Sequence, residues 1–154
     1  LIYGEATRVM SLRDGTKKMS KSDASELSRV LLTDSNDAIA TKLKKAKSDS
    51  DLIPDSVELL KEKAECINLI NILSATMNQS QEKTLQEFAG REYSILKNKL
   101  AESLIEVLGP IREEIENLLN NKDELNKILA IGTEKAEEIA NPILQEVYKI
   151  VGFR

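Results

Sequence analysis

Apolar residues recur at steps of three and four along most of this chain, which is the spacing of one face of an α-helix. The clearest stripe lies between residues 94 and 120 and consists of Leu100, Leu104, Leu108, Ile111, Ile115 and Leu118. A helix with such a stripe gains most of its stability by burying it against other elements. The chain is therefore predicted to be mainly α, with a helical bundle as its larger part.

Serine caps and a helix-ending glycine divide this region. Ser35, or Asp34 before it, suits the first N-cap, and Ser80 suits a later one. Gly90 fits the left-handed position that ends the helix after Ser80. The predicted helices are 35–47, 56–77 with an internal break, 81–89, 94–120, 123–132 and 133–150. The apolar residues of the last helix are expected to face inward, namely Ala136, Ile139, Ile143, Val147 and Ile150.

The first 34 residues do not show this helical period. Two short segments, 8–12 and 28–32, are predicted as strands on either side of a loop rich in glycine, lysine and serine. This part is interpreted as a short α/β remnant that precedes the bundle. The chain begins with Leu1 and shows no basic-then-apolar leader, so we expect it to be a piece of a longer protein.

Composition excludes several kinds of chemistry within this chain. There is no histidine, which excludes Ser–His and Cys–His catalysis and histidine-ligated zinc sites. The single cysteine, Cys66, cannot form an internal disulfide and is interpreted as a core residue of a cytoplasmic protein. Apolar runs are short and interrupted by charges, so no membrane-spanning segment is expected.

Charge is distributed unevenly along the chain. Residues 8–47 carry ten lysines and arginines and five acidic residues, a net charge of +5, although the whole chain carries −4. An anionic ligand is therefore expected near the N-terminus. The acidic remainder would not bind nucleic acid by charge alone.

The segment KMSKS at residues 18–22 carries the most specific chemistry in the sequence. Its two ammonium groups are point charges suited to phosphate oxygens, and its hydroxyl and backbone N–H groups add donors. This arrangement suits a nucleotide polyphosphate, where negative charge builds on the leaving pyrophosphate. By composition alone, a short loop of lysine and serine is more often a solvated surface turn. The order of the residues favours the nucleotide interpretation.

KMSKS is the second signature of class I aminoacyl-tRNA synthetases, and its surroundings resemble the bacterial tryptophanyl-tRNA synthetases. The similar segments are RVMSL at 8–12, TKKMSKSD at 16–23, LTD at 32–34, FAGREY at 88–93, LGPI at 108–111 and VGF at 151–153. The related tyrosyl family usually has a KFGKS-like loop, so Met19 and Ser20 favour tryptophan. The turn at residues 13–15 departs from the form that many members have.

The resemblance implies three parts. Residues 1–34 would end a Rossmann-like catalytic domain with its KMSKS loop, 35–55 would be a connecting helix and loop, and 56–154 a helical tRNA anticodon-binding domain. The intact enzyme would use ATP, with Mg²⁺ as its ATP complex, to form tryptophanyl-adenylate and transfer tryptophan to tRNA(Trp). The tryptophan pocket would lie in an upstream half. The intact enzyme would be a homodimer, and the chain alone an inactive monomer.

The resemblance also implies roles for individual residues. Lys18 and Lys21 would be catalytic, neutralising charge on the leaving pyrophosphate. The nucleotide-binding residues would be Val9, Lys18, Met19, Ser20, Lys21 and Ser22, and no metal site on the protein is expected. Val9 would pack on adenine, although its residue type equally suits a core strand.

Contacts to tRNA are less specific in the sequence. The basic residues considered are Arg91, Lys97, Lys99 and Arg112, with Lys42, Lys44, Lys45 and Lys47 near the end of a helix. Each also suits a solvated helix face or compensation of the helix dipole. The alternative function is a stand-alone helical module that binds tRNA or protein and retains a vestigial KMSKS loop.

Overall fold

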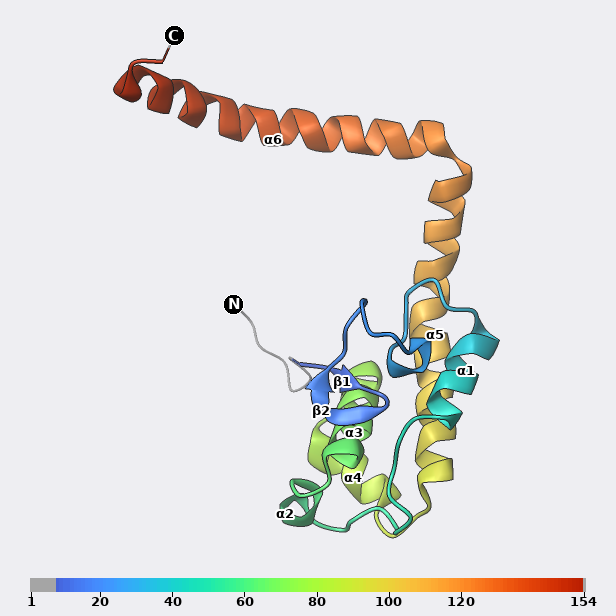
Figure 1. Ribbon diagram of the computed structural model, residues 1–154. Helices are drawn as coiled ribbons and strands as arrows, with labels where there is room; N and C mark the ends of the chain where they lie inside the picture. The colour runs from blue at the N-terminus through green and yellow to red at the C-terminus, as the bar shows by residue number, and fades with distance from the viewer. Residues whose placement is uncertain (1–7, 154) are drawn as a thin grey trace. The chain divides into compact units, whose positions relative to one another are not determined.

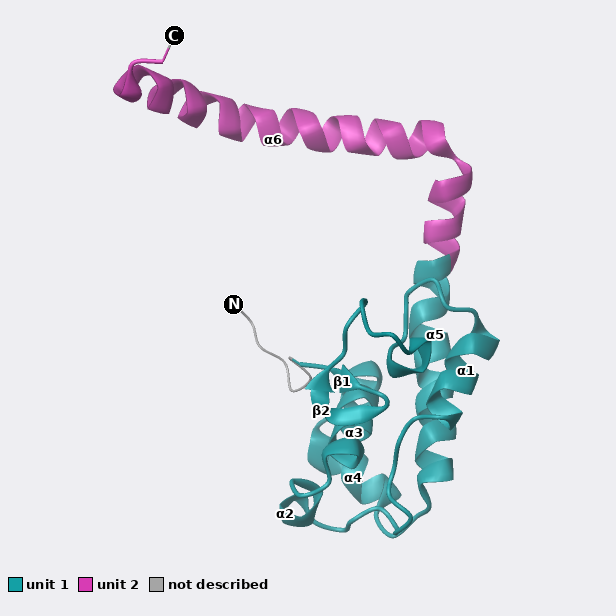
Figure 2. Cartoon of the chain, in the orientation of Figure 1, with its two compact units in different colours: residues 1–112 teal, residues 113–154 magenta. Residues whose placement is uncertain are grey.

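The computed structural model describes residues 8–153 and divides the chain into two compact units (Figure 2). The first unit extends to Arg112 and the second begins at Glu113, so the boundary falls inside the long helix α5, Tyr93–Asn120. Helix α6, Lys122–Val151, belongs to the second unit. No helix within residues 8–153 combines the length and the apolar composition needed to cross a membrane.

The first unit contains a β-hairpin followed by helices (Figure 1). Strands β1 (Met10–Ser11) and β2 (Asp14–Lys18) pair antiparallel, with Met10 opposite Lys18 and Ser11 opposite Asp14. The elements that follow are η1 (Glu26–Ser28), α1 (Asn36–Lys44), α2 (Val57–Leu60), α3 (Ala64–Met77), α4 (Gln81–Phe88) and α5. Six α-helices and one two-stranded sheet within the described residues confirm the prediction of a mainly α chain.

The caps predicted at Ser35, Ser80 and Gly90 are confirmed, whereas those predicted at Asp123 and Thr133 are wrong because α6 begins after Asn121 and continues through both residues. Ser35 and Ser80 each accept a hydrogen bond from the backbone N–H three residues further on, at 3.2 and 3.3 Å, and begin α1 and α4. Gly90 follows α4 with φ of +69°, a conformation that glycine adopts without steric cost, and its N–H donates to the Ile53 carbonyl at 2.9 Å. The break expected within 56–77 separates α2 from α3.

Two predicted elements are wrong. Segment 28–32 is not a strand, because β1 pairs with the adjacent β2 through a short turn, which costs less entropy than closing a longer loop. The second error is the helix end predicted at Gly132. Helix α6 continues through it, and the Thr133 hydroxyl donates to the Leu129 carbonyl at 3.0 Å within the same helix instead of capping a new one.

One hydrophobic core spans the first unit. Leu12 of the hairpin, Ile39 and Leu43 of α1, and Ile53 of the loop before α2 are buried in the same cluster as residues of α3, α4 and α5. Apolar residues from each of the three predicted parts therefore share this core. Cys66 lies in this core as a free thiol, as predicted, and burial raises its pKa.

Helix α6 exposes the apolar face that the sequence predicts to be buried. Ile139, Ile143, Val147 and Ile150 are 71%, 59%, 47% and 78% exposed, and Ala136 is exposed as well. The prediction that these residues face inward is wrong for this chain. Periodicity identifies an apolar face of a helix but not the surface that covers it.

Burial also differs along the apolar stripe of α5, which gives a test of stability. We expect Leu100→Ala to lower the free energy of unfolding by about 2–5 kcal/mol, because Leu100 is fully buried and the substitution leaves a cavity. Ile111→Ala, further along the stripe, should cost under about 1 kcal/mol because Ile111 is 43% exposed. Urea denaturation followed by circular dichroism measures both values. Equal losses in the free energy of unfolding would show that burial does not decide the effect of these substitutions.

Candidate functional site

The KMSKS residues lie at the end of strand β2 and in the loop that follows it. Lys18 is the last residue of β2, and residues 19–22 begin the loop. The Met19 amide donates to the Val9 carbonyl at 3.1 Å. The hairpin therefore places the start of the loop beside Val9, and it brings together two of the residues that the sequence predicts at one site.

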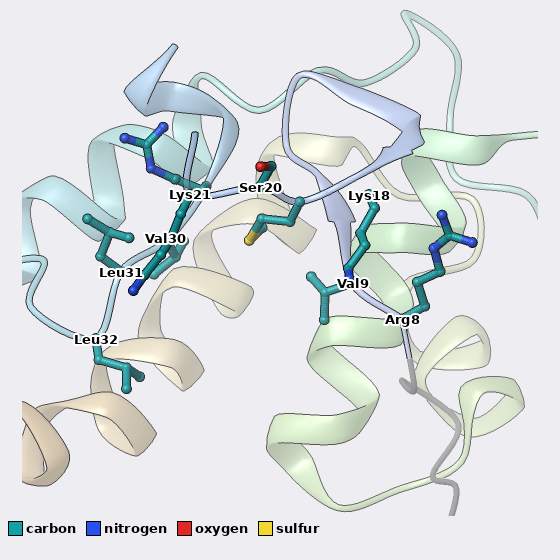
Figure 3. A pocket seen from close by; sticks show the side chains of 10 residues that line it. Arg8, Val9, Lys18, Ser20, Lys21, Val30, Leu31 and Leu32 are labelled. Atoms are coloured by element: carbon teal, nitrogen blue, oxygen red, sulfur yellow. The ribbon is translucent and has the colours of Figure 1, made fainter. Parts of the chain in front are cut away.

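An open pocket of about 760 Å³ lies at this junction (Figure 3). Its lining residues are Arg8, Val9, Lys18, Met19, Ser20, Lys21, Arg29, Val30, Leu31 and Leu32. Figure 3 shows Lys18 and Val9 on one side of the pocket and Lys21 on the other, with Ser20 between them. Of the residues predicted to bind nucleotide, only Ser22 is not part of this described lining.

The pocket combines cationic side chains with apolar ones, which are Val9, Met19, Val30, Leu31 and Leu32. The basic residues of its described lining are Arg8, Lys18, Lys21 and Arg29, and none of that lining is acidic. Within residues 8–153, no ion pair involves Lys18 or Lys21, whereas the neighbouring Lys17 lies 3.2 Å from the Asp14 carboxylate. Unpaired ammonium groups beside apolar side chains favour a ligand that has an anionic part and an apolar part.

The Asp14 carboxylate is engaged in the turn of the hairpin. Asp14 accepts hydrogen bonds from the Thr16 hydroxyl at 2.6 Å and from the Thr16 amide at 3.1 Å. These bonds, with a smaller contribution from Lys17, lower the pKa of Asp14 to about 2. The negative charge of Asp14 is therefore engaged within the turn and is not placed opposite Lys18 or Lys21.

Hydrogen bonds within the loop hold the residues that follow Lys18. The hydroxyl oxygens of Ser20 and Ser22 lie 3.0 Å apart, and the Ser22 amide donates to the Ser20 hydroxyl at 3.3 Å. Arg29 Nη1 donates to the carbonyls of Asp23 and Ser25, at 2.9 and 3.3 Å. Arg29 thus joins the end of the KMSKS loop to the opposite wall of the pocket.

The sequence did not identify this opposite wall, residues 29–32. Its apolar residues were interpreted as a strand, but the structure makes them an irregular segment in which the Leu31 amide donates to the Asp34 carboxylate at 2.8 Å. The signal that could have found this wall is Arg29, which lies in the same basic part of the sequence as Lys18 and Lys21.

Most of the basic residues considered for tRNA contact have partners within the first unit. The Lys42 ammonium is buried 2.5 Å from the Asp34 carboxylate, and Lys97 donates to the Ala46 carbonyl at 2.7 Å. Arg112 donates to the Asp34 carbonyl at 2.9 Å. The other pairs are Lys47 with Glu65 at 2.7 Å, Lys99 with Glu102 at 3.9 Å, and Arg91 with the Phe88 ring at 6.0 Å. Lys44 and Lys45 remain exposed.

The amino-acid sequence of the chain is similar to those of known proteins. Residues 2–109 match the family model of tRNA synthetases class I (W and Y). The tryptophan–tRNA ligases of Agrobacterium fabrum and Caulobacter vibrioides are each 46% identical to this chain over 153 residues. These alignments cover 99% of the chain but only 43% and 44% of the two relatives. The chain therefore spans less than half the length of these curated relatives.

Solved structures share the fold. The crystal structure of tryptophanyl-tRNA synthetase from Mycoplasma pneumoniae matches with a TM-score of 0.82 at 24% identity, covering 99% of this chain and 45% of that protein. The Campylobacter jejuni enzyme complexed with ADP and tryptophan matches with a TM-score of 0.70 at 25% identity, covering 99% of this chain and 46% of that protein. Because the family model covers most of the sequence, the chain belongs to the family of class I tRNA synthetases for tryptophan and tyrosine.

Proposed function

We propose that this chain is part of a tryptophan–tRNA ligase and that its KMSKS loop takes part in ATP-dependent activation of tryptophan. The main support is the pocket that joins an apolar wall at Val9 to the unpaired ammonium groups of Lys18 and Lys21. In the same proposal, residues 1–34 end the catalytic domain, 35–55 connect the domains, and 56–154 form the anticodon-binding domain.

The adenine ring of ATP would lie against the apolar wall. Val9 is 36% exposed, so its side chain is available to pack on a ring instead of being enclosed in the core. The Met19 backbone, held beside Val9 by its hydrogen bond, would lie along the adenine edge. Ser20 and Ser22 would supply hydroxyl or backbone donors to phosphate oxygens.

Lys18 and Lys21 would act on the phosphates. When the tryptophan carboxylate attacks the α-phosphorus, the bond to pyrophosphate breaks and negative charge accumulates on the leaving group. Ammonium groups on the two sides of the pocket would neutralise that charge and stabilise the transition state. Mg²⁺ would enter as its complex with ATP. Within residues 8–153, no group of three or more His, Cys, Asp or Glu side chains could hold a metal ion.

The second step would transfer tryptophan from the adenylate to tRNA(Trp). Recognition of an unpaired anticodon loop depends on stacking and on hydrogen bonds to the bases. The tryptophan pocket and the homodimer interface would be supplied by parts of the enzyme outside this chain. We therefore propose that the chain alone does not catalyse the reaction.

Tryptophan-dependent exchange of pyrophosphate into ATP tests this proposal. The complete enzyme, which contains this chain, is expected to catalyse exchange with tryptophan, whereas tyrosine in its place should support little. The 154-residue chain alone should show none with either amino acid. Exchange driven by tyrosine would assign the protein to the other branch of the family. Absence of exchange with both, together with tRNA binding by the chain, would favour the stand-alone binding module.

A further inference from the structure

We propose that Asn68 is a positioning residue that holds the hairpin at the nucleotide pocket; this inference rests on the function proposed above. Asn68 lies on α3 and is 3% exposed. Its Oδ1 accepts a hydrogen bond from the Met10 amide at 2.9 Å, and its Nδ2 donates to the Met10 carbonyl at 2.9 Å. One side chain therefore satisfies both backbone polar groups of Met10, as a neighbouring strand would.

The two edges of strand β1 have different partners. The Val9 carbonyl accepts the Met19 amide, on the side of β2, whereas the polar groups of Met10 are bonded to Asn68. Successive residues of a strand direct their backbone groups to opposite edges, so both sets of bonds can form together. Asn68 thus takes the place of a third strand at an edge that would otherwise be unpaired.

This bond pattern connects Asn68 to the pocket through a single residue. Val9 immediately precedes Met10, and Lys18 is the register partner of Met10 in the hairpin. Met19 is bonded to Val9. A displacement of Met10 would therefore move Val9, Lys18 and Met19 together, and all three residues line the pocket.

A second contact fixes the hairpin on the same helix. A Cβ atom at Gly15 would lie 2.5 Å from the carbonyl carbon and oxygen of Ala64 and 2.6 Å from the Glu65 nitrogen, so only glycine allows this approach. Ala64 begins α3, and Asn68 lies one turn further along. The hairpin is therefore held near its turn by close packing and at β1 by hydrogen bonds. Two such points define its orientation on α3.

The identity of Asn68 is explained by these bonds and not by packing. The residues that follow it, Leu69 and Ile70, are buried apolar side chains. A buried carboxamide without partners is unfavourable compared with an apolar side chain. An asparagine at this position is therefore expected to set the register of the hairpin, because an apolar residue would fill the space without fixing Met10.

Asn68→Asp is the informative variant, with Asn71→Asp as its matched control. Aspartate keeps the size of the side chain but places a carboxylate oxygen against the Met10 carbonyl, in place of the donating amide. Asn71 lies one turn further along α3, and its side chain accepts a hydrogen bond from Gln81 of α4.

In the complete enzyme, Asn68→Asp is expected to lower kcat for tryptophan-dependent pyrophosphate exchange about tenfold to a hundredfold. The KM for tryptophan should stay the same, and Asn71→Asp should retain kcat. In the 154-residue chain, the amides of Met10 and Met19 should exchange hydrogen faster in Asn68→Asp than in the control. If Asn68 only stabilised the fold, kcat and hydrogen exchange would change in both variants in proportion to the stability that each variant loses.

Equal kcat values for the two variants, or unchanged hydrogen exchange at Met19 in Asn68→Asp, would overturn the proposal. Asn68→Ser, which is too short to reach Met10 but adds no charge, replaces Asn68→Asp if that variant does not unfold cooperatively. A complete wild-type enzyme without exchange activity would refute the proposed function. Hydrogen exchange at Met10 and Met19 would then still decide whether Asn68 positions the hairpin.

Discussion

Replacing Lys21 with alanine in the complete enzyme is expected to slow tryptophan-dependent pyrophosphate exchange about a hundredfold to a thousandfold. The Lys21 ammonium faces the pocket without an ion-pair partner in the described chain, and it would meet the pyrophosphate most closely as charge develops there. Loss of such a charge corresponds to about 3–4 kcal/mol of transition-state stabilisation. Exchange is measured at saturating tryptophan and ATP. Tryptophan affinity should change little.

Lys17→Ala provides the matched control for this prediction. Lys17 lies in the same basic run, but its side chain is 77% exposed, pairs with Asp14, and is not part of the described pocket lining. We expect its removal to leave the exchange rate within about twofold of the wild-type value, because exposed ion pairs contribute little. A Lys21→Ala variant with exchange as fast as Lys17→Ala would remove Lys21 from the catalytic residues.

Asp34→Ala is expected to lower the free energy of unfolding of this chain by about 3–5 kcal/mol. The side chains of Asp34 and Lys42 are only 12% and 9% exposed and lie 2.5 Å apart, so the substitution leaves a buried ammonium without its counter-charge. It also removes the acceptor of the Leu31 amide, next to the pocket wall. Urea denaturation gives the free energies of the wild-type and variant chains.

Two further variants separate burial from charge in this experiment. Glu102→Ala breaks an exposed pair with Lys99, whose side chains are 72% and 48% exposed, and should cost no more than about 1 kcal/mol. Combining Asp34→Ala with Lys42→Met removes the stranded charge and should recover part of the lost stability. A double variant less stable than Asp34→Ala would show that the buried, unpaired Lys42 charge does not cause the loss of stability.

Local chemistry made the helices and the motif predictable. Ser35, Ser80 and Gly90 act on backbone groups within a few residues of themselves, so their effects can be recognised without knowing the rest of the fold. The KMSKS loop was equally recognisable because its specificity lies in the order of consecutive residues. Val9, Lys18 and Lys21 line one pocket, and their roles there stay predictions.

The errors occurred where distant residues decide the structure. Segment 28–32 has the composition of a strand, but neither edge of β1 is free to pair with it. One edge pairs with β2, and Asn68 bonds the backbone at the other edge. Lys42 looked like one of several exposed lysines near a helix end. Only the buried Asp34 carboxylate shows that its charge is used inside the fold.

The sequence by itself determined the family of this protein, its mainly helical fold and the position of its KMSKS motif. These properties depend on periodicity, caps and residue order, and each of these signals lies in residues that are close together in sequence. Only the tertiary structure decided which basic residues are free, which wall completes the pocket and how Asn68 holds the hairpin. Those properties depend on side chains far apart in sequence that meet after the core has formed, because burial and pairing, more than residue type, decide what a charged or polar group can do.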